Sequence, residues 1–384
     1  MGEKRSAADS GIADADEHAG GGGGKRSCIE ITDDYEVTCW LGKGAFGAVI
    51  RARHRATGKD VAIKFLRRHR RGMGGGGGGG GKAVGEDALL REALYLARCS
   101  HHPSIVHYHG LALEPRSGMW GLVMEHVGPS LSSVLRERHG GGGPPFTEEE
   151  VRRVMRQLLS GVQRLHERHV VHRDIKPGNI LVGDGGVVKL CDLGLAMDTA
   201  ARKPPYQKAG SPGYKAPEML LGKPDYGELV DAWSAGCVMG ELLAGVPLFR
   251  GHSETDELLR IFRLLGAPCR QTWPSYPSLP LFGAVPICRS WDRNRLRNLF
   301  PEERLSRDGF EVLNGLLTCN PDARLSAAEA LRLPWFTATV DGTAAADAKI
   351  GQSAASPRQE PPPAAAAASF AAIPCGDRGT SFAG

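Results

Sequence analysis

Residues 172–179 read His-Arg-Asp-Ile-Lys-Pro-Gly-Asn, and a further carboxylate, Asp192, follows in the next segment. Between them lie two short apolar runs, Ile-Leu-Val at 180–182 and Val-Val-Lys-Leu at 187–190, separated by Gly-Asp-Gly-Gly. Apolar runs on both sides of a glycine-rich turn predict a short hairpin. We therefore expect residues 172–179 to form a loop that leads into a hairpin, with Asp192 just after its second strand.

The polar residues of this loop are of the types that phosphoryl transfer requires. Transfer through a loose, in-line transition state needs a positioned hydroxyl, metal ions on the phosphates and neutralisation of the developing charge. Asp174 suits the first task, Asn179 and Asp192 the second, and Lys176 the third. A charged surface loop could carry these residues by chance, but it would not explain the motifs that lie upstream and downstream.

Residues 35–336 resemble a eukaryotic protein kinase domain, and five of its signature motifs are present in order. They are the glycine loop at 42–49 (Gly-Lys-Gly-Ala-Phe-Gly-Ala-Val), Val61-Ala62-Ile63-Lys64, the loop at 172–179, Asp192-Leu193-Gly194 and Ala216-Pro217-Glu218. The resemblance implies an α+β, two-lobed protein kinase fold. Its N-terminal lobe would be a small antiparallel sheet with one helix, and its larger C-terminal lobe would be mainly helical.

The resemblance also indicates where the domain and the two tails begin and end. Residues 1–34 form a Gly/Ala-rich tail and residues 337–384 an Ala/Pro-rich tail, and we expect both to be disordered because they contain few large apolar residues. Residues 35–336 would be the kinase domain, with the N-lobe at about 35–124, the hinge at 125–130 and the C-lobe at 131–336. Glycine runs at 74–81 and 140–143 fall between expected elements, where loop insertions are tolerated.

Amino-acid composition limits the other classes of protein to which the chain could belong. At 384 residues and 41% hydrophobic residues the chain can bury a sizeable core, and its net charge of +5 is modest. The basic run at 67–71 is expected to be a solvated loop, so a nucleic-acid partner is not expected. Nine cysteines without a Cys-x-x-Cys pair predict reduced thiols and an intracellular protein of the nucleus and/or cytoplasm. No signal peptide or membrane span is expected.

Kinase resemblance implies roles for named residues, with ATP and Mg²⁺ as cofactors. The catalytic residues would be Asp174, Lys176, Lys64 and Glu92, and the metal ligands Asn179 and Asp192. The ATP-binding residues would be Leu41, Gly42, Lys43, Gly44, Ala45, Phe46, Gly47, Ala48, Val49, Ala62, Lys64, Met124, Glu125, Val127 and Leu181. The glycines would let backbone N–H groups approach the phosphates. A dinucleotide-binding loop would need a helix after the glycines, whereas residues 48–53 are typical of a strand.

Other residues indicate the class of kinase. Lys176 and the sequence Gly-Ser-Pro-Gly-Tyr at 210–214 resemble serine/threonine kinases, with Ser211 expected to contact Asp174 and Lys176. Glu218 is expected to be buried against Arg324, and Asp231 to brace the catalytic loop. Residues 248–268 resemble cyclin-dependent kinases, and 294–301 and 309–314 resemble the PITSLRE-type members. The competing interpretation is a pseudokinase or scaffold that binds nucleotide and partners without turnover.

Several positions depart from the cyclin-dependent kinase pattern. The implied partners are protein substrates and a cyclin or cyclin-like activator, yet the cyclin-contacting helix signature is replaced by Gly-Glu-Asp-Ala-Leu-Leu-Arg-Glu at 85–92. Lys215 replaces an arginine tied to proline selection. Met197 and Tyr206 stand where relatives have an arginine and a phosphothreonine. We therefore expect activity without threonine phosphorylation of the activation segment, the alternative being that Thr199 is the phosphorylated residue.

Overall fold

The structure is a computed structural model, and it describes residues 34–43, 47–66, 84–99, 101–115, 118–201, 204, 206, 209–283, 285–288 and 290–338. Several expectations lie outside these residues. They concern the two tails, the glycine run at 74–81, the basic run at 67–71, and Gly44, Ala45 and Phe46 of the glycine loop.

The N-terminal lobe is built on a five-stranded antiparallel sheet with the order β1-β2-β3-β5-β4. Its strands are β1 (Tyr35–Lys43), β2 (Gly47–His54), β3 (Asp60–Leu66), β4 (Tyr108–Glu114) and β5 (Met119–Glu125). The strand expected at 48–53 lies within β2.

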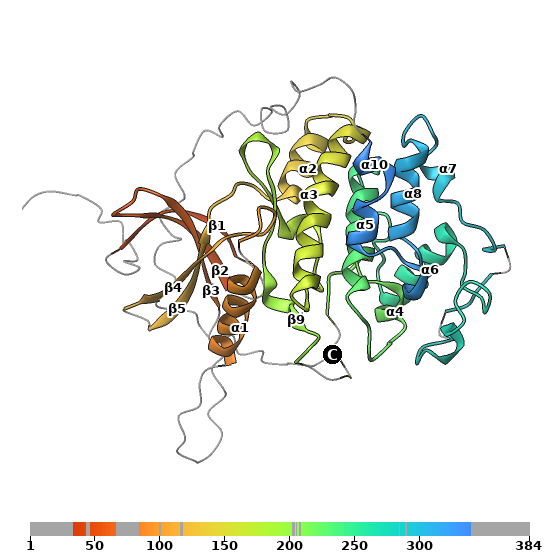
Figure 1. Ribbon diagram of the computed structural model, residues 1–384, viewed down its shortest axis with the longest axis horizontal. Helices are drawn as coiled ribbons and strands as arrows, with labels where there is room; N and C mark the ends of the chain where they lie inside the picture. The colour runs from red at the N-terminus through yellow and green to blue at the C-terminus, as the bar shows by residue number, and fades with distance from the viewer. Residues whose placement is uncertain are drawn as a thin grey trace, which may run out of the picture. The chain divides into compact units, whose positions relative to one another are not determined.

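Helix α1 (Val84–Cys99) packs beside this sheet (Figure 1). Its buried apolar residues Leu89, Ala93 and Leu96 recur at helical spacing, so one face of the helix covers the core. Glu92 lies on the same face and is 1% exposed. A charged side chain is seldom buried this deeply unless it has a partner.

The C-terminal lobe is mainly helical, and α5 is its central element. Almost every residue of α5 is buried, as expected for a helix that is apolar on all sides. The helices are α2 (Leu131–Gly140), α3 (Glu148–Glu167), α4 (Pro217–Leu220), α5 (Leu229–Ala244), α6 (Glu254–Leu265), α7 (Leu296–Leu299), α8 (Arg307–Leu316), α9 (Ala327–Leu331) and α10 (Pro334–Thr337). The α+β, two-lobed architecture is confirmed.

Capping residues mark several helix starts. Thr147 and Glu150 form a reciprocal capping box at the start of α3, and Ser326 and Glu329 form another at α9. Ser253 caps α6 by accepting from the backbone N–H of Asp256. Helix α2, capped by Ser130, was not predicted.

Short elements carry the chain around the loop at 172–179. The predicted hairpin is present as β7 (Ile180–Val182) and β8 (Val188–Leu190), and β6 (Val170–Val171) pairs with β9 (Met197–Asp198). Five 3-10 turns complete the described elements, namely η1 (Pro177–Asn179), η2 (Asp184–Gly186), η3 (Leu193–Leu195), η4 (Tyr276–Ser278) and η5 (Pro321–Ala323).

Candidate active site

The loop at 172–179 is fixed from below by a buried carboxylate of α5. Asp231 accepts hydrogen bonds from the backbone N–H groups of His172 (2.7 Å) and Arg173 (2.8 Å), and from the His166 ring (3.0 Å). Arg173 has a left-handed φ of 66°, and this anchoring helps to hold that strained conformation. The expectation that Asp231 braces the loop is confirmed.

Electrostatics at Asp231 agree with that anchoring role. Burial would raise the pKa of Asp231, but the hydrogen bond and charge of His166 and the further donors around the carboxylate outweigh it and lower the pKa. The carboxylate is therefore held in its ionised, acceptor-only form.

Asp174 is the centre of a compact hydrogen-bond network. One carboxylate oxygen, Oδ1, accepts from the Ser211 hydroxyl at 2.7 Å, and Oδ2 accepts from Lys176 Nζ and Asn179 Nδ2, both at 2.9 Å. Lys176 also donates to the Ser211 hydroxyl at 2.6 Å. The expected contacts of Ser211 with Asp174 and Lys176 are confirmed. The carboxylate and the ammonium together bind an aliphatic hydroxyl, which is the chemistry that a serine or threonine acceptor presents.

The β7–β8 hairpin brings Asn179 and Asp192 to neighbouring positions. Ile180 pairs with Leu190, and the N–H of Cys191 donates to the Asn179 carbonyl at 3.0 Å, so the residues just outside the two strands face each other. Asn179 uses its amide nitrogen on Asp174, which leaves the amide oxygen as the atom it can offer to a cation. An amide oxygen and a carboxylate are hard ligands that suit Mg²⁺.

Lys64 joins the N-terminal lobe to Asp192. Its ammonium donates to both carboxylate oxygens of Glu92 at 2.8 Å and to Asp192 Oδ1 at 2.6 Å. Burial would lower the pKa of Lys64, but the charges of Glu92 and Asp192 outweigh it and raise the pKa. Burial likewise opposes ionisation of Asp192, yet the Lys64 ammonium lowers its pKa. Burial raises the pKa of Glu92, an effect that the charge of Lys64 opposes. With both carboxylates ionised, the cluster carries one more negative than positive formal charge.

Strand register places several predicted nucleotide-binding residues on one face of the sheet. Val49 is opposite Lys64, and Ala62 is opposite Met124. Because alternate residues of a strand share a face and directly opposed residues do too, these four side chains project to the same side. Val49 and Ala62 are half-buried, whereas Met124 is buried.

The remaining residues of the predicted adenine site lie at the edges of this face. Leu41 of β1 is 45% exposed. Leu181 of the hairpin bridges to Ser130, at the end of the expected hinge. The backbone N–H of Glu125 donates to the His107 carbonyl at 3.0 Å, and Val127 lies just beyond β5.

The described part of the glycine loop consists of Gly42 and Lys43 at the end of β1 and Gly47 and Ala48 at the start of β2. Gly47 is required for packing, because a Cβ there would lie 1.8 Å from the carbonyl oxygen of Phe65. Strand β2 pairs antiparallel with β1, so the glycine loop connects two strands. A dinucleotide-binding loop would instead be followed by a helix.

Behind the loop at 172–179, the Arg173 side chain donates hydrogen bonds to a backbone carbonyl and to a tyrosine hydroxyl. It donates from Nε to the Leu195 carbonyl at 2.7 Å and from Nη1 to the Tyr226 hydroxyl at 2.9 Å. The Tyr226 ring packs edge-on against Tyr206 with centroids 5.5 Å apart. Met197, which replaces an arginine of the resembled family, is fully buried in β9.

A buried ion pair was also expected from the sequence. Glu218 and Arg324 form a bidentate ion pair of two 2.7 Å contacts and are almost fully buried, so that prediction is confirmed. The Cys191 thiol contacts the Asn179 carbonyl, and burial raises its pKa, so this thiol is expected to be unreactive.

Some residues that support the candidate site were not predicted from the sequence. His166 on α3 supports Asp231, Tyr226 binds Arg173, and Lys189 holds the Glu125 side chain at 2.6 Å. Each contact joins residues far apart in the chain. The sequence signal that could have indicated such a residue is its type. Lys189, for example, is a polar residue between two apolar residues of β8.

A protein kinase domain model matches residues 35–336 of the chain. The chain therefore belongs to the protein kinase family. It is 46% identical over 309 residues to the putative cyclin-dependent kinase F-2 of Oryza sativa subsp. japonica, a match covering 79% of this chain and 90% of the relative. It is 37% identical over 324 residues to cyclin-dependent kinase G-1 of Oryza sativa subsp. indica, covering 81% of this chain and 44% of the relative.

The serine/threonine-protein kinase ppk23 of Schizosaccharomyces pombe is 34% identical over 312 residues, a match covering 81% of this chain and 74% of the relative. Together with the site, these relatives define the chain as a serine/threonine protein kinase that resembles the cyclin-dependent kinases. Protein kinases generally use ATP and Mg²⁺ and act on protein substrates. Among the described residues, no helix is long and apolar enough to cross a membrane.

Proposed function

We propose that residues 35–336 form a catalytic domain that transfers the γ-phosphate of ATP to serine or threonine of protein substrates, with Mg²⁺ as cofactor. The observation that carries this proposal is the Asp174 network, in which a carboxylate and the Lys176 ammonium already bind the Ser211 hydroxyl. In the proposed reaction Asp174 orients the acceptor hydroxyl and accepts its proton. Lys176 neutralises the negative charge that develops on the transferred group.

The cluster of Lys64, Glu92 and Asp192 supports the assignment of cofactors. Its surplus negative charge and the hard oxygen ligands of Asn179 and Asp192 fit a divalent cation. Bound Mg²⁺ would neutralise phosphate charge. Lys64 would bind the phosphates, with Glu92 holding its ammonium in position. Val49, Ala62, Leu41 and Leu181 would enclose the adenine.

For activation, we propose that order in the activation segment comes from aromatic packing. In the resembled kinases a phosphothreonine is bound by arginines, whereas here Arg173 donates to Tyr226, which packs on Tyr206. The alternative source of order is a partner that binds α1 and holds Glu92 against Lys64, which form an ion pair at 2.8 Å. A cyclin or cyclin-like activator would act in this way.

We also propose that the enzyme works in a reducing compartment, the nucleus and/or the cytoplasm. Every cysteine in the described part of the chain has a free thiol. Reduced thiols are typical of proteins in such compartments.

The test is transfer of labelled γ-phosphate from ATP to a generic basic protein by the purified chain, followed by phosphoamino-acid analysis. Phosphoserine and phosphothreonine are expected. Asp174→Asn should lower the rate by at least about 100-fold, within the range for loss of a general base, while ATP binding stays nearly unchanged because this carboxylate does not contact adenine. ATP binding by the unaltered chain without any transfer would favour the pseudokinase alternative.

A further inference from the structure

Arg98, in the last turn of α1, connects this helix to two segments of the C-terminal lobe. Its Nη1 donates to Asp198 Oδ2 at 2.6 Å, and its Nη2 donates to the Arg168 carbonyl at 2.5 Å. Figure 1 shows β9, which contains Asp198, beside α1. Arg168 is the C-cap of α3, so Arg98 also satisfies a carbonyl of the kind that a helix leaves unpaired at its end. We call these two contacts the Arg98 bridge.

The acidic end of the bridge is fixed at the start of the activation segment. Asp198 belongs to β9, which pairs with β6, the strand that leads directly into the loop at 172–179. Its other oxygen, Oδ1, accepts from the backbone N–H groups of Ala200 at 2.8 Å and Ala201 at 3.1 Å. Burial opposes ionisation of Asp198, but the Arg98 hydrogen bond and these backbone donors lower its pKa. The carboxylate is therefore ionised, and both of its oxygens are used.

The bridge and Glu92 hold α1 at two separate points. Arg98 follows Glu92 by six residues, which places the two side chains about 120° apart around the helix axis and about 9 Å apart along it. The apolar face of α1 holds the helix against the core, but hydrophobic contacts are non-directional and resist rotation weakly. A second directional contact at a different angle opposes a rotation that would carry Glu92 away from Lys64.

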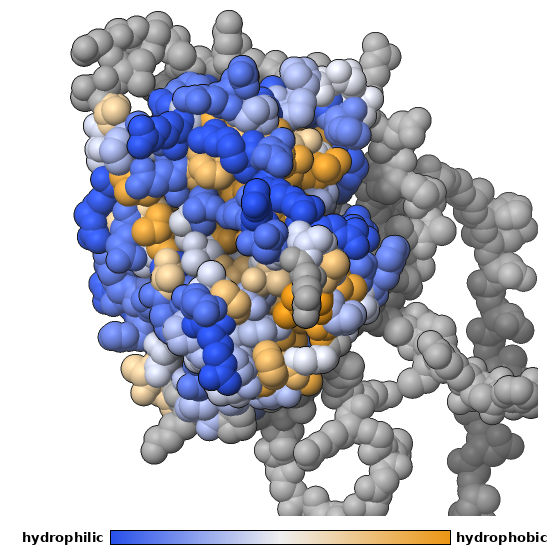
Figure 2. All heavy atoms as spheres, turned by 90° about the vertical axis from the view of Figure 1, so that its right-hand side faces the viewer, coloured by the Kyte–Doolittle hydropathy of each residue, from blue (hydrophilic) through white to orange (hydrophobic). Residues whose placement is uncertain are grey.

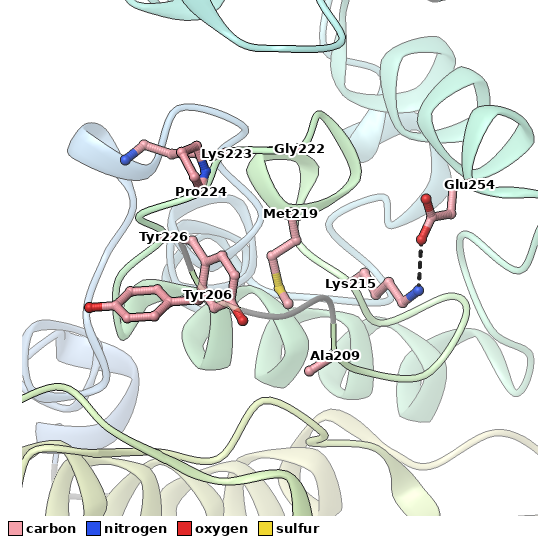
Figure 3. Close-up of a pocket in the computed structure, with 9 residues that line it drawn as sticks. All are labelled: Tyr206, Ala209, Lys215, Met219, Gly222, Lys223, Pro224, Tyr226 and Glu254. Atoms are coloured by element: carbon pink, nitrogen blue, oxygen red, sulfur yellow. Dashed lines mark hydrogen bonds and ion pairs between the residues drawn. The ribbon is translucent and has the colours of Figure 1, made fainter. Parts of the chain in front are cut away.

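A different contact holds the later part of the activation segment. Figure 3 shows Tyr206 beside Tyr226, and their rings pack edge-on with centroids 5.5 Å apart. Tyr226 lies between α4 and α5, so this contact attaches the segment to the C-terminal lobe. The Arg98 bridge instead attaches the start of the segment to α1.

We infer that Arg98 is a positioning residue, which ties α1 to the start of the activation segment and so keeps Glu92 beside Lys64. Asp198 lies in the same segment as Asp192, so the bridge couples the orientation of α1 to the strand that follows the proposed metal ligand. A change that moves β9 would therefore also move Glu92. This inference rests on the proposed function and adds a means of regulation to it.

The experiment measures, for each variant, phosphate transfer from ATP to a generic basic protein and hydrogen exchange of the backbone amides. Arg98→Ala should lower kcat/KM for ATP at least about tenfold, because Glu92 would no longer hold Lys64 in position for the phosphates. The KM for the protein substrate should change by less than about twofold, because the bridge does not contact the Asp174 network. Amides of α1 should exchange at least about fivefold faster, while those of α5 keep their rate.

Two further variants test the bridge as a unit. Arg98→Lys should give an intermediate loss, because an ammonium lacks the planar fork that reaches both acceptors. Asp198→Asn keeps an oxygen for the backbone donors of Ala200 and Ala201 but removes the negative charge, and it should resemble Arg98→Ala. Combining Arg98→Ala with Asp198→Asn should lower activity no further, because two residues that act through one contact have non-additive effects.

Arg260→Ala is the matched control. Arg260 is 45% exposed and pairs with Asp256 at 3.1 Å, whereas Arg98 is 40% exposed and pairs with Asp198 at 2.6 Å. Both residues of the control pair belong to α6, so it connects no separate elements. Helix α6 lies on the side of the molecule that faces the viewer in Figure 2, away from α1. Arg260→Ala should match the unaltered enzyme in transfer and in exchange.

Three results would overturn the inference and leave the proposed function intact. They are full activity in Arg98→Ala, unchanged exchange in α1 of that variant, and faster exchange in α5 as well, since the last would show a general loss of stability. A chain that transfers no phosphate overturns the proposed function instead. In that case, faster exchange confined to α1 in Arg98→Ala, and absent from Arg260→Ala, still upholds the bridge.

Discussion

Lys64 and Arg324 are both buried cations that face carboxylates, but their surroundings differ. Arg324 binds one carboxylate, Glu218, and its remaining N–H groups donate to the carbonyls of Thr318, Leu229 and Cys319. Lys64 instead faces two carboxylates, Glu92 and Asp192. The Arg324 site is balanced in charge and complete, as a structural pair should be. The Lys64 site has surplus negative charge, as expected of a site that receives a cation.

Asp192→Asn provides the strongest test of this contrast. It removes the surplus charge, so it should lower kcat/KM by more than about 1,000-fold, or about 4 kcal/mol in the barrier, and weaken Mg²⁺-dependent ATP binding. Stability should change little, because Lys64 keeps Glu92 as its partner. Steady-state kinetics, ATP titration with and without Mg²⁺ and thermal unfolding would measure this. Activity above a few per cent of the unaltered enzyme would contradict the assignment.

Glu218→Gln should show the opposite pattern, a loss of stability. Leaving Arg324 buried beside a neutral group should reduce the free energy of unfolding by about 3–5 kcal/mol. Chemical denaturation measures this value. Asp225→Asn is the matched control, since it breaks an exposed pair with Lys223 and should change stability by less than about 1 kcal/mol. Equal effects of the two variants would show that burial of the Glu218 pair does not matter.

Asp231 should make stability depend on pH in the acidic range. Its folded-state pKa is lowered, so its contribution is fully present above the unfolded value of about 3.9 and is lost as the pH falls through the folded pKa. The stability difference between the unaltered enzyme and Asp231→Asn should therefore be constant from pH 5 to 7 and shrink below about pH 4. Urea denaturation over this range measures it, and a difference that stays constant down to pH 3 would refute the prediction.

The smallest effect is expected at the activation segment, where Arg173 binds the neutral Tyr226. Phosphatase-treated enzyme and Thr199→Ala should both keep the activity of untreated enzyme. The Thr199 N–H and hydroxyl both donate to the His169 carbonyl, which places this residue at the end of β9 and gives it no evident part in the site. A loss of more than about tenfold, about 1.4 kcal/mol in the barrier, would show that a phosphate switch exists.

Contacts set by local chemistry were predictable from the sequence. The Thr147 capping box and the β7–β8 hairpin depend on residues a few positions apart, and both are present. The Lys64–Glu92 pair was predicted through the family resemblance. The supporting residues His166 and Tyr226 were not predicted, because a histidine or tyrosine becomes important there only through tertiary contacts.

The bond from Arg173 to Tyr226 also bears on how such an enzyme is controlled in time. A phosphate on threonine can be added and removed within seconds, so a kinase that depends on it can be reset. A tyrosine ring built into the chain persists for the lifetime of the protein. Under the proposed activation mechanism, the amount of active enzyme would follow the rates of its synthesis and degradation, and its signal would decay only as fast as the protein is destroyed.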